Sequence, residues 1–155
     1  MGTMATMSRV ISGMVLLVSL PPLYLSITSS GLLMRYEDMT KKAANYSAEA
    51  GRQLHKTRTT QGAAVIASLA STISATCLIF TRSSTSTNAI LATVNAAACL
   101  GARVYISDFW KGAARVPGSG DYNDAVRATE QAITWLGGLS GAWVGYAAYL
   151  GLFGA

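Results

Sequence analysis

Charged residues are confined to short stretches of this chain, and long apolar stretches lie between them. No Asp, Glu, Lys or Arg occurs in residues 10–34, 59–81, 83–102 or 131–155. An α-helix rises about 1.5 Å per residue, so roughly 20 mostly apolar residues are needed to cross a hydrocarbon layer of about 30 Å. The pattern therefore predicts four membrane-spanning helices in one domain, residues 1–155. Their approximate ranges are 10–34, 59–81, 89–110 and 131–153.

The composition favours a membrane environment over a soluble bundle. Hydrophobic residues make up 51% of the chain and charged residues 12%, where a soluble domain typically has about 25% charged residues. A soluble helix would also carry a polar outer face, and the four segments show none. We therefore predict an all-α, integral membrane four-helix bundle whose main partner is the lipid bilayer. No zinc-type spacing, phosphate-binding loop or Ser/His/Asp order occurs, so no metal site is predicted.

The basic residues are distributed unevenly between the two ends of the predicted bundle. Arg9 and Arg82 fall at one end, and the other ten of the twelve Lys and Arg residues flank the first and third loops. Cytoplasmic loops are the ones enriched in Lys and Arg. We therefore predict cytosolic first and third loops and both termini lumenal or outside. Because topology accounts for the basic residues, no nucleic-acid partner is predicted. The endoplasmic reticulum is the first candidate location, and other organelle membranes remain open.

Small residues recur at four-residue spacing in two of the predicted spans. Such residues let helix backbones approach closely where lipid offers no hydrophobic drive to associate. We predict packing faces here and a homo-oligomer that buries the glycines. The stripes are Gly137, Gly141 and Gly145 in the last span, and Ala63, Ala67, Ser71 and Ala75 in the second.

Two clusters near the predicted cytosolic side are candidates for ligand binding. At about 100° per residue, Arg52, His55 and Arg58 fall on one side of the second helix and face one cytosolic opening. Arg103 shares a stripe of the third helix with Trp110. An arginine at membrane depth is costly, so it usually faces a cavity or a partner. The alternatives are that Arg103 extends toward the interface or pairs with Asp108, and that the loop cations only set topology.

Three stretches are similar in residue type and spacing to a known family of membrane enzymes. They are Arg52-x-Leu54-His55-x-x-Arg58; Arg103-Val104 followed by Trp110, Gly112, Arg115 and Pro117; and Gly31-x-x-x-Arg35 leading into Lys41-Lys42-Ala43. The chain in these stretches resembles the membrane-associated proteins in eicosanoid and glutathione metabolism. That family includes the microsomal glutathione transferases and microsomal prostaglandin E synthase, and its members keep both termini lumenal.

The resemblance implies a glutathione-dependent transferase, peroxidase or isomerase that acts on a lipophilic substrate. It implies a trimer with glutathione, as co-substrate, in clefts between neighbouring subunits. Arg52, Arg58 and Arg103 would contact the carboxylates of glutathione, with His55 and Trp110 as further substrate-binding residues. Arg127 or Arg115 would be the catalytic residue, because a nearby guanidinium favours the thiolate over the thiol.

Two other functions stay open. Thr59 and Gly62 stand where the family has an Asn and a Glu that hold the amino-acid ends of glutathione. These differences favour a non-enzymatic membrane subunit of a larger complex. Ser12-Gly13 and Trp135 are similar to a third class, the small cofactor-free membrane oxygenases that act on anthrones.

Overall fold

The structure is a computed structural model, and its described part is entirely helical apart from short connections. It describes the backbone of residues 2–44, 48–81, 83–111 and 120–153, with side chains in these ranges except for 2–5, 39–44 and 48–55. The helices are α1 (Gly2–Ala44), α2 (Ala48–Phe80), α3 (Thr85–Trp110) and α4 (Gly120–Phe153). The prediction of an all-α chain with four long helices is confirmed for these residues.

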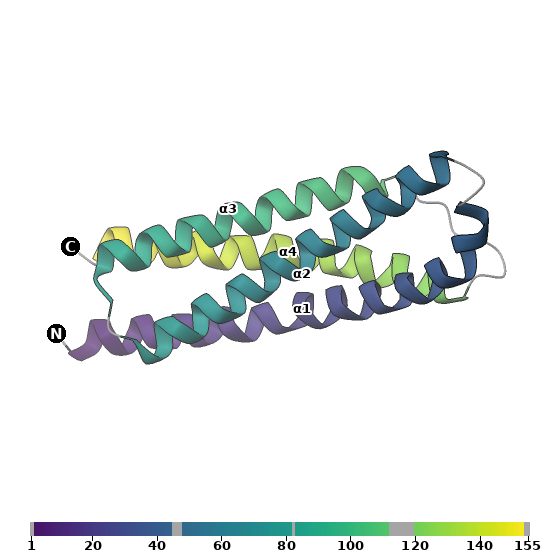
Figure 1. The fold of residues 1–155 in the computed structure, drawn as a ribbon. Coiled ribbons are helices and arrows are strands. Elements are labelled where there is room, and N and C mark those ends of the chain that lie inside the picture. Colours follow the sequence, from purple (N-terminus) through teal and green to yellow (C-terminus); the bar gives the residue numbers. More distant parts are fainter. Residues whose placement is uncertain (1, 45–47, 82, 112–119, 154–155) are drawn as a thin grey trace.

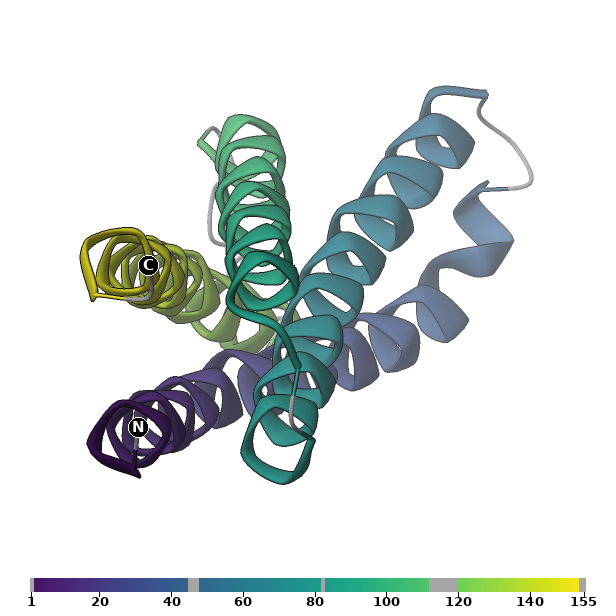
Figure 2. The ribbon, with the colours of Figure 1, turned by 90° about the vertical axis from the view of Figure 1, so that its left-hand side faces the viewer.

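The four helices run alternately up and down in an elongated bundle (Figure 1). Both termini lie at one end, which Figure 2 faces. The last turns of α1 and α3 and the first turns of α2 and α4 lie at the other end. We call this second end the basic end. In the described part, α1 packs against α2 and α4, and α3 packs against α4 and, over a smaller interface, against α2. Among the residues that the structure describes, α1 and α3 do not contact each other, so these two helices occupy opposite corners of the bundle.

Three of the described helices are long and apolar enough to cross a membrane. These segments are Thr6–Asp38, Lys56–Phe80 and Thr85–Trp110. The helix that contains the fourth predicted span, α4, is long enough but is not among them. Glycine, tyrosine and tryptophan are frequent in its second half and lower its mean hydropathy. The helices also extend beyond the predicted spans at the basic end, where α1 continues to Ala44 and α4 begins at Gly120.

The interior of the bundle holds many small and polar side chains beside its large apolar ones, and many large apolar side chains are exposed on the outside. On α1 the inward face carries Ser12, Ser19 and Ser26, all fully buried, while Leu17 and Tyr24 are exposed. A protein folded in water buries its large apolar residues and rarely leaves wide apolar surfaces exposed. Lipid reverses this preference, because it solvates large apolar side chains and leaves hydroxyl groups to find partners inside the protein. The side-chain distribution therefore agrees with a membrane protein.

A buried hydrogen-bond network joins three helices near the middle of the bundle. The indole Nε1 of Trp143 on α4 donates to Ser71 Oγ on α2 at 2.8 Å. Ser71 Oγ lies 3.3 Å from both Asn95 Oδ1 and Cys99 Sγ on α3. Asn95 Nδ2 donates to Ser74 Oγ at 3.0 Å. Ser71 is thus a polar hub at which α2, α3 and α4 meet.

The two predicted small-residue stripes behave differently. In α2, Ala67, Ser71 and Ala75 are buried within the bundle, so this stripe does pack against neighbouring helices. In α4, Gly141 and Gly145 are exposed, and an added Cβ at either position would meet nothing within 4 Å. Gly141 and Gly145 are therefore not used for packing within a single chain, whereas Gly137 lies against Arg103 of α3.

Candidate functional site

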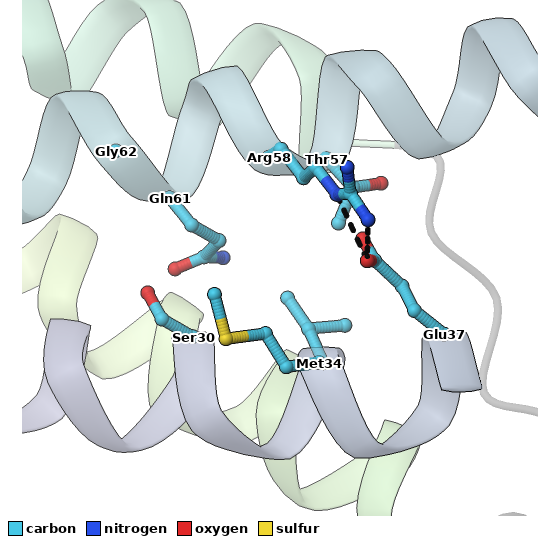
Figure 3. A pocket seen from close by; sticks show the side chains of 8 residues that line it. Ser30, Met34, Glu37, Thr57, Arg58, Gln61 and Gly62 are labelled. Carbon is cyan, nitrogen blue, oxygen red and sulfur yellow. Dashed lines mark hydrogen bonds and ion pairs between the residues drawn. The ribbon is translucent and has the colours of Figure 1, made fainter. Parts of the chain in front are cut away.

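A pocket of about 220 Å³ lies between α1 and α2, toward the basic end of the bundle. Figure 3 shows it from close by, with α1 on one side and α2 on the other. Its wall combines a few polar groups at one end with apolar and backbone surface elsewhere. The lining residues are Ser30, Leu33, Met34, Glu37, Thr57, Arg58, Gln61 and Gly62.

An ion pair closes one end of the pocket. Arg58 Nε and Nη2 donate to the same carboxylate oxygen of Glu37, Oε2, at 2.9 and 2.7 Å (Figure 3). The Glu37 side chain is 6% exposed, whereas that of Arg58 is 55% exposed. Hydrogen bonds between ionised partners are shorter and stronger than neutral ones, and a buried carboxylate needs such a partner. The guanidinium therefore neutralises Glu37 and remains accessible on its other side.

Behind the ion pair, the polar atoms of the pocket wall are already engaged. The Gln61 side-chain amide accepts from Ser29 Oγ at 2.6 Å and donates to Thr129 Oγ1 at 2.9 Å, which links α1, α2 and α4. Ser30 Oγ donates to the carbonyl of Ser26 in its own helix at 2.7 Å. What remains open to a ligand in this part of the wall is mainly apolar surface, above all from Met34.

Gly62 widens the pocket, because a glycine at this position adds no side chain to the wall. A Cβ placed there would meet nothing within 4 Å, so the space beside it is open. Thr59 faces α3 instead of the pocket. Its Oγ1 lies 3.1 Å from the hydroxyl of Tyr105 on α3. Gly62 thus leaves space in the pocket, and Thr59 connects α2 to α3.

The candidate arginines do not converge within one chain. Arg58 faces α1 through its ion pair with Glu37. Arg103 on α3 lies across α4 instead, and a Cβ added to Gly137 would come 3.0 Å from its Nε. The absence of a side chain at Gly137 therefore makes room for Arg103. The alternative pairing of Arg103 with Asp108 is not formed in the described structure, where the Asp108 carboxylate binds Lys111 Nζ at 2.7 Å.

The remaining predicted site residues have different positions. Arg127 is exposed on α4, and no hydrogen bond or ion pair to the described residues engages either it or Arg103. Arg115 lies outside the described residues. Arg52 and His55 lie within α2, but their side chains are outside the described part.

Trp110 belongs to an aromatic cluster at the basic end and not to the pocket. Its ring lies 5.4 Å from Phe109 and 6.5 Å from Tyr122, and Tyr122 lies 5.1 Å from Tyr36 on α1. Trp110 is buried, so its role in the described structure is to join α1, α3 and α4 by packing. Burial in this cluster, and secondarily the neighbouring Tyr36, raises the pKa of Tyr122 above its usual range.

Sequence reasoning identified Arg58 as a site residue and Gly62 only as a difference from the resembling family, and it did not assign Glu37 or Met34 to a site. Glu37 carried a signal, since it is the first acidic residue after the first predicted span and lies beside basic loop residues. Among the residues that the structure describes, no group of three His, Cys, Asp or Glu side chains could hold a metal ion. No family model, curated protein or solved structure matches the chain.

Proposed function

We propose that this protein binds a small lipophilic molecule in the α1–α2 pocket and transforms it with glutathione. The observation that carries the first half is the pocket itself, which combines an apolar wall with the Arg58–Glu37 pair. Binding sites for small molecules are typically concave and mostly apolar, with a few polar groups that fix orientation. Met34, which lines the pocket, is also exposed on the outside of the bundle.

The proposal places all four helices across a membrane of the endoplasmic reticulum or another organelle. Ten of the twelve Lys and Arg residues flank the first and third loops, which supports a cytosolic basic end and lumenal termini. The α1–α2 pocket then lies near the cytosolic interface. A lipophilic substrate enters it from the bilayer, and a water-soluble thiol approaches from the cytosol.

The use of glutathione is supported by arginines that have no anionic partner among the described residues. Glutathione carries two carboxylates, and hydrogen bonds to charged groups contribute about 1.5–3 kcal/mol each. Arg103 and Arg127 are exposed and unpaired among the described residues, so their charges are available to such a ligand. Arg58 is already neutralised by Glu37, and we assign it to the lipophile. The family resemblance adds the trimer, in which subunits share each glutathione site and Arg127 or Arg115 stabilises the thiolate.

Calorimetric titration of the purified protein in nanodiscs with glutathione tests this assignment. Arg103→Ala should weaken glutathione binding about tenfold or more, since about 1.4 kcal/mol corresponds to one decade. Arg9→Ala, which removes an exposed cation at the opposite end of the bundle, is the matched control and should change nothing. If the wild-type protein shows no heat of binding at millimolar glutathione, the enzymatic half of the proposal fails.

The exposed glycines of α4 support a second candidate, a non-enzymatic subunit of a membrane complex. Gly138, Gly141 and Gly145 are exposed, and no atom lies within 4 Å of an added Cβ at any of them. Small residues at such spacing are what closely packed membrane helices present to one another. Absence of glutathione binding together with stable co-purification of a partner helix protein would favour this function.

A further inference from the structure

We infer that the ligand of the α1–α2 pocket is an electrically neutral lipophile with a single ring and an oxygen acceptor, such as an alkylated aromatic ketone. This inference rests on the proposed lipophile site and specifies its substrate class. It draws on three properties of the pocket. They are its volume, the charge balance of its polar end, and the donors that Arg58 still has available.

The volume limits the part of the ligand that the pocket encloses. An apolar cavity of about 150 Å³ is sufficient to hold one benzene molecule. The α1–α2 pocket of about 220 Å³ therefore accommodates one substituted six-membered ring. It is smaller than the roughly 300–1,000 Å³ that encloses a drug-sized molecule, so an attached alkyl chain must leave the pocket. Exposed Met34 marks a route by which that chain can enter the lipid.

The charge balance disfavours an anionic ligand. Arg58 and Glu37 together carry no net charge and both line the pocket, and the neighbouring Asp38 adds a further negative charge that acts on Arg58. An anion beside Arg58 would also lie near the Glu37 carboxylate, so attraction to one is offset by repulsion from the other. The anion would still lose its hydration on entering, and that loss is costly for a charged group and small for a ketone.

The remaining donors of Arg58 favour an oxygen acceptor over a plain hydrocarbon. A guanidinium has five N–H groups, and Glu37 accepts from the Nε group and from Nη2. Within the described residues, no other hydrogen bond occupies Arg58, and its side chain is half exposed. Three guanidinium N–H groups of Arg58 are therefore left without a partner among the described residues, and a carbonyl oxygen at the polar end of the pocket can accept from one of them without displacing Glu37.

Three ligands of matched shape test this assignment on the full-length protein in nanodiscs. They are 4-octylacetophenone, with a neutral acceptor; 4-octylbenzoate, ionised at neutral pH; and octylbenzene, without an acceptor. Binding is measured for each and corrected for partition into protein-free nanodiscs. We expect 4-octylacetophenone to bind at least tenfold tighter than either of the other two.

Two kinds of variant connect binding to the pocket and to its charge. Met34→Trp should fill the pocket and weaken ketone binding at least tenfold, whereas Met14→Trp should not. Met14 is the matched control because it lies on the same helix and is 60% exposed, against 62% for Met34. Glu37→Gln keeps a hydrogen-bond acceptor for Arg58 and leaves the pocket with one positive charge, so the preference should shift toward 4-octylbenzoate.

The outcomes separate this inference from the proposed function. If wild-type protein binds 4-octylbenzoate as tightly as the ketone, and Met34→Trp abolishes both, the pocket stands and the neutral ligand class is wrong. Equal binding of octylbenzene and ketone in the pocket would likewise refute the role of Arg58. If no ligand binds above protein-free nanodiscs, or Met34→Trp behaves like Met14→Trp, the lipophile site itself is refuted.

Discussion

Replacing Ser71 with alanine tests whether the buried polar network stabilises the bundle. Ser71 Oγ accepts the indole N–H of Trp143 at 2.8 Å, and both residues are fully buried. Ser71 Oγ donates to Asn95 Oδ1 at 3.3 Å, and between Ser71 Oγ and Cys99 Sγ, also 3.3 Å apart, either group can be the donor. The substitution therefore leaves the Trp143 donor without its acceptor, in a region that neither water nor lipid can satisfy.

The unpaired indole N–H of Trp143 determines how much Ser71→Ala lowers the free energy of unfolding. Leaving a buried polar group without a partner costs about 1–3 kcal/mol in proteins generally. Hydrogen bonds between membrane helices average about 0.6 kcal/mol and reach about 1.7 kcal/mol, because partners also exist in the unfolded state within the membrane. We expect Ser71→Ala to lower the free energy of unfolding by about 1–2 kcal/mol, since complete burial of Trp143 places this bond near the upper limit.

Unfolding by increasing dodecyl sulfate in mixed micelles, followed by tryptophan fluorescence and circular dichroism, measures this change. Ser12→Ala is the matched control, because Ser12 is also fully buried but donates only to the Ser8 carbonyl of its own helix. Trp143→Phe, made alone and together with Ser71→Ala, completes a double-mutant cycle that isolates the pair. A coupling energy near zero, or an equal loss in Ser12→Ala, would refute the reasoning.

Three further predictions concern packing, orientation and pH. Gly141→Leu should lower the stability of a homo-oligomer in detergent, because a large side chain there would hold neighbouring helices apart. Gly101→Leu on α3 is the control, since Gly101 is also exposed and has open space beside it. If both variants form oligomers of equal stability, the α4 glycines do not form a packing face. Asn45, which lies outside the described residues, heads the sequon Asn45-Tyr46-Ser47 and should remain unglycosylated in a eukaryotic host; a glycan there would reverse the proposed orientation. Because the pKa of Tyr122 is raised in the folded state, the folded protein favours the neutral phenol. The contribution of Tyr122 to the free energy of unfolding is therefore complete below its unfolded-state pKa of about 10 and is lost as pH rises through the folded-state pKa. Tyr122→Phe should therefore show a flatter decline of stability in alkaline solution, and an unchanged decline would contradict this.

The helices themselves could be derived from the sequence. A run of about 20 residues without charge is a local property, and in lipid an isolated segment must form a helix to satisfy its own backbone. Ser12, Ser19 and Ser26 recur at seven-residue intervals, but only the structure showed that they form the inward face of α1. The prediction that the fourth segment crosses a membrane had weaker support, since α4 is not among the helices that are apolar enough to span one.

The site required the tertiary structure. Glu37 and Arg58 lie on different helices, and whether they meet depends on how far each helix is rotated about its axis and shifted along it. A segment that is apolar on all sides has no single stripe that sets this rotation, so the sequence pattern leaves it open. The same reason separates Arg58 from Arg103, because packing turns one toward α1 and lays the other across Gly137. The sequence by itself determined four helices and their basic end, whereas packing between the helices decided which charges are neutralised and where a pocket forms.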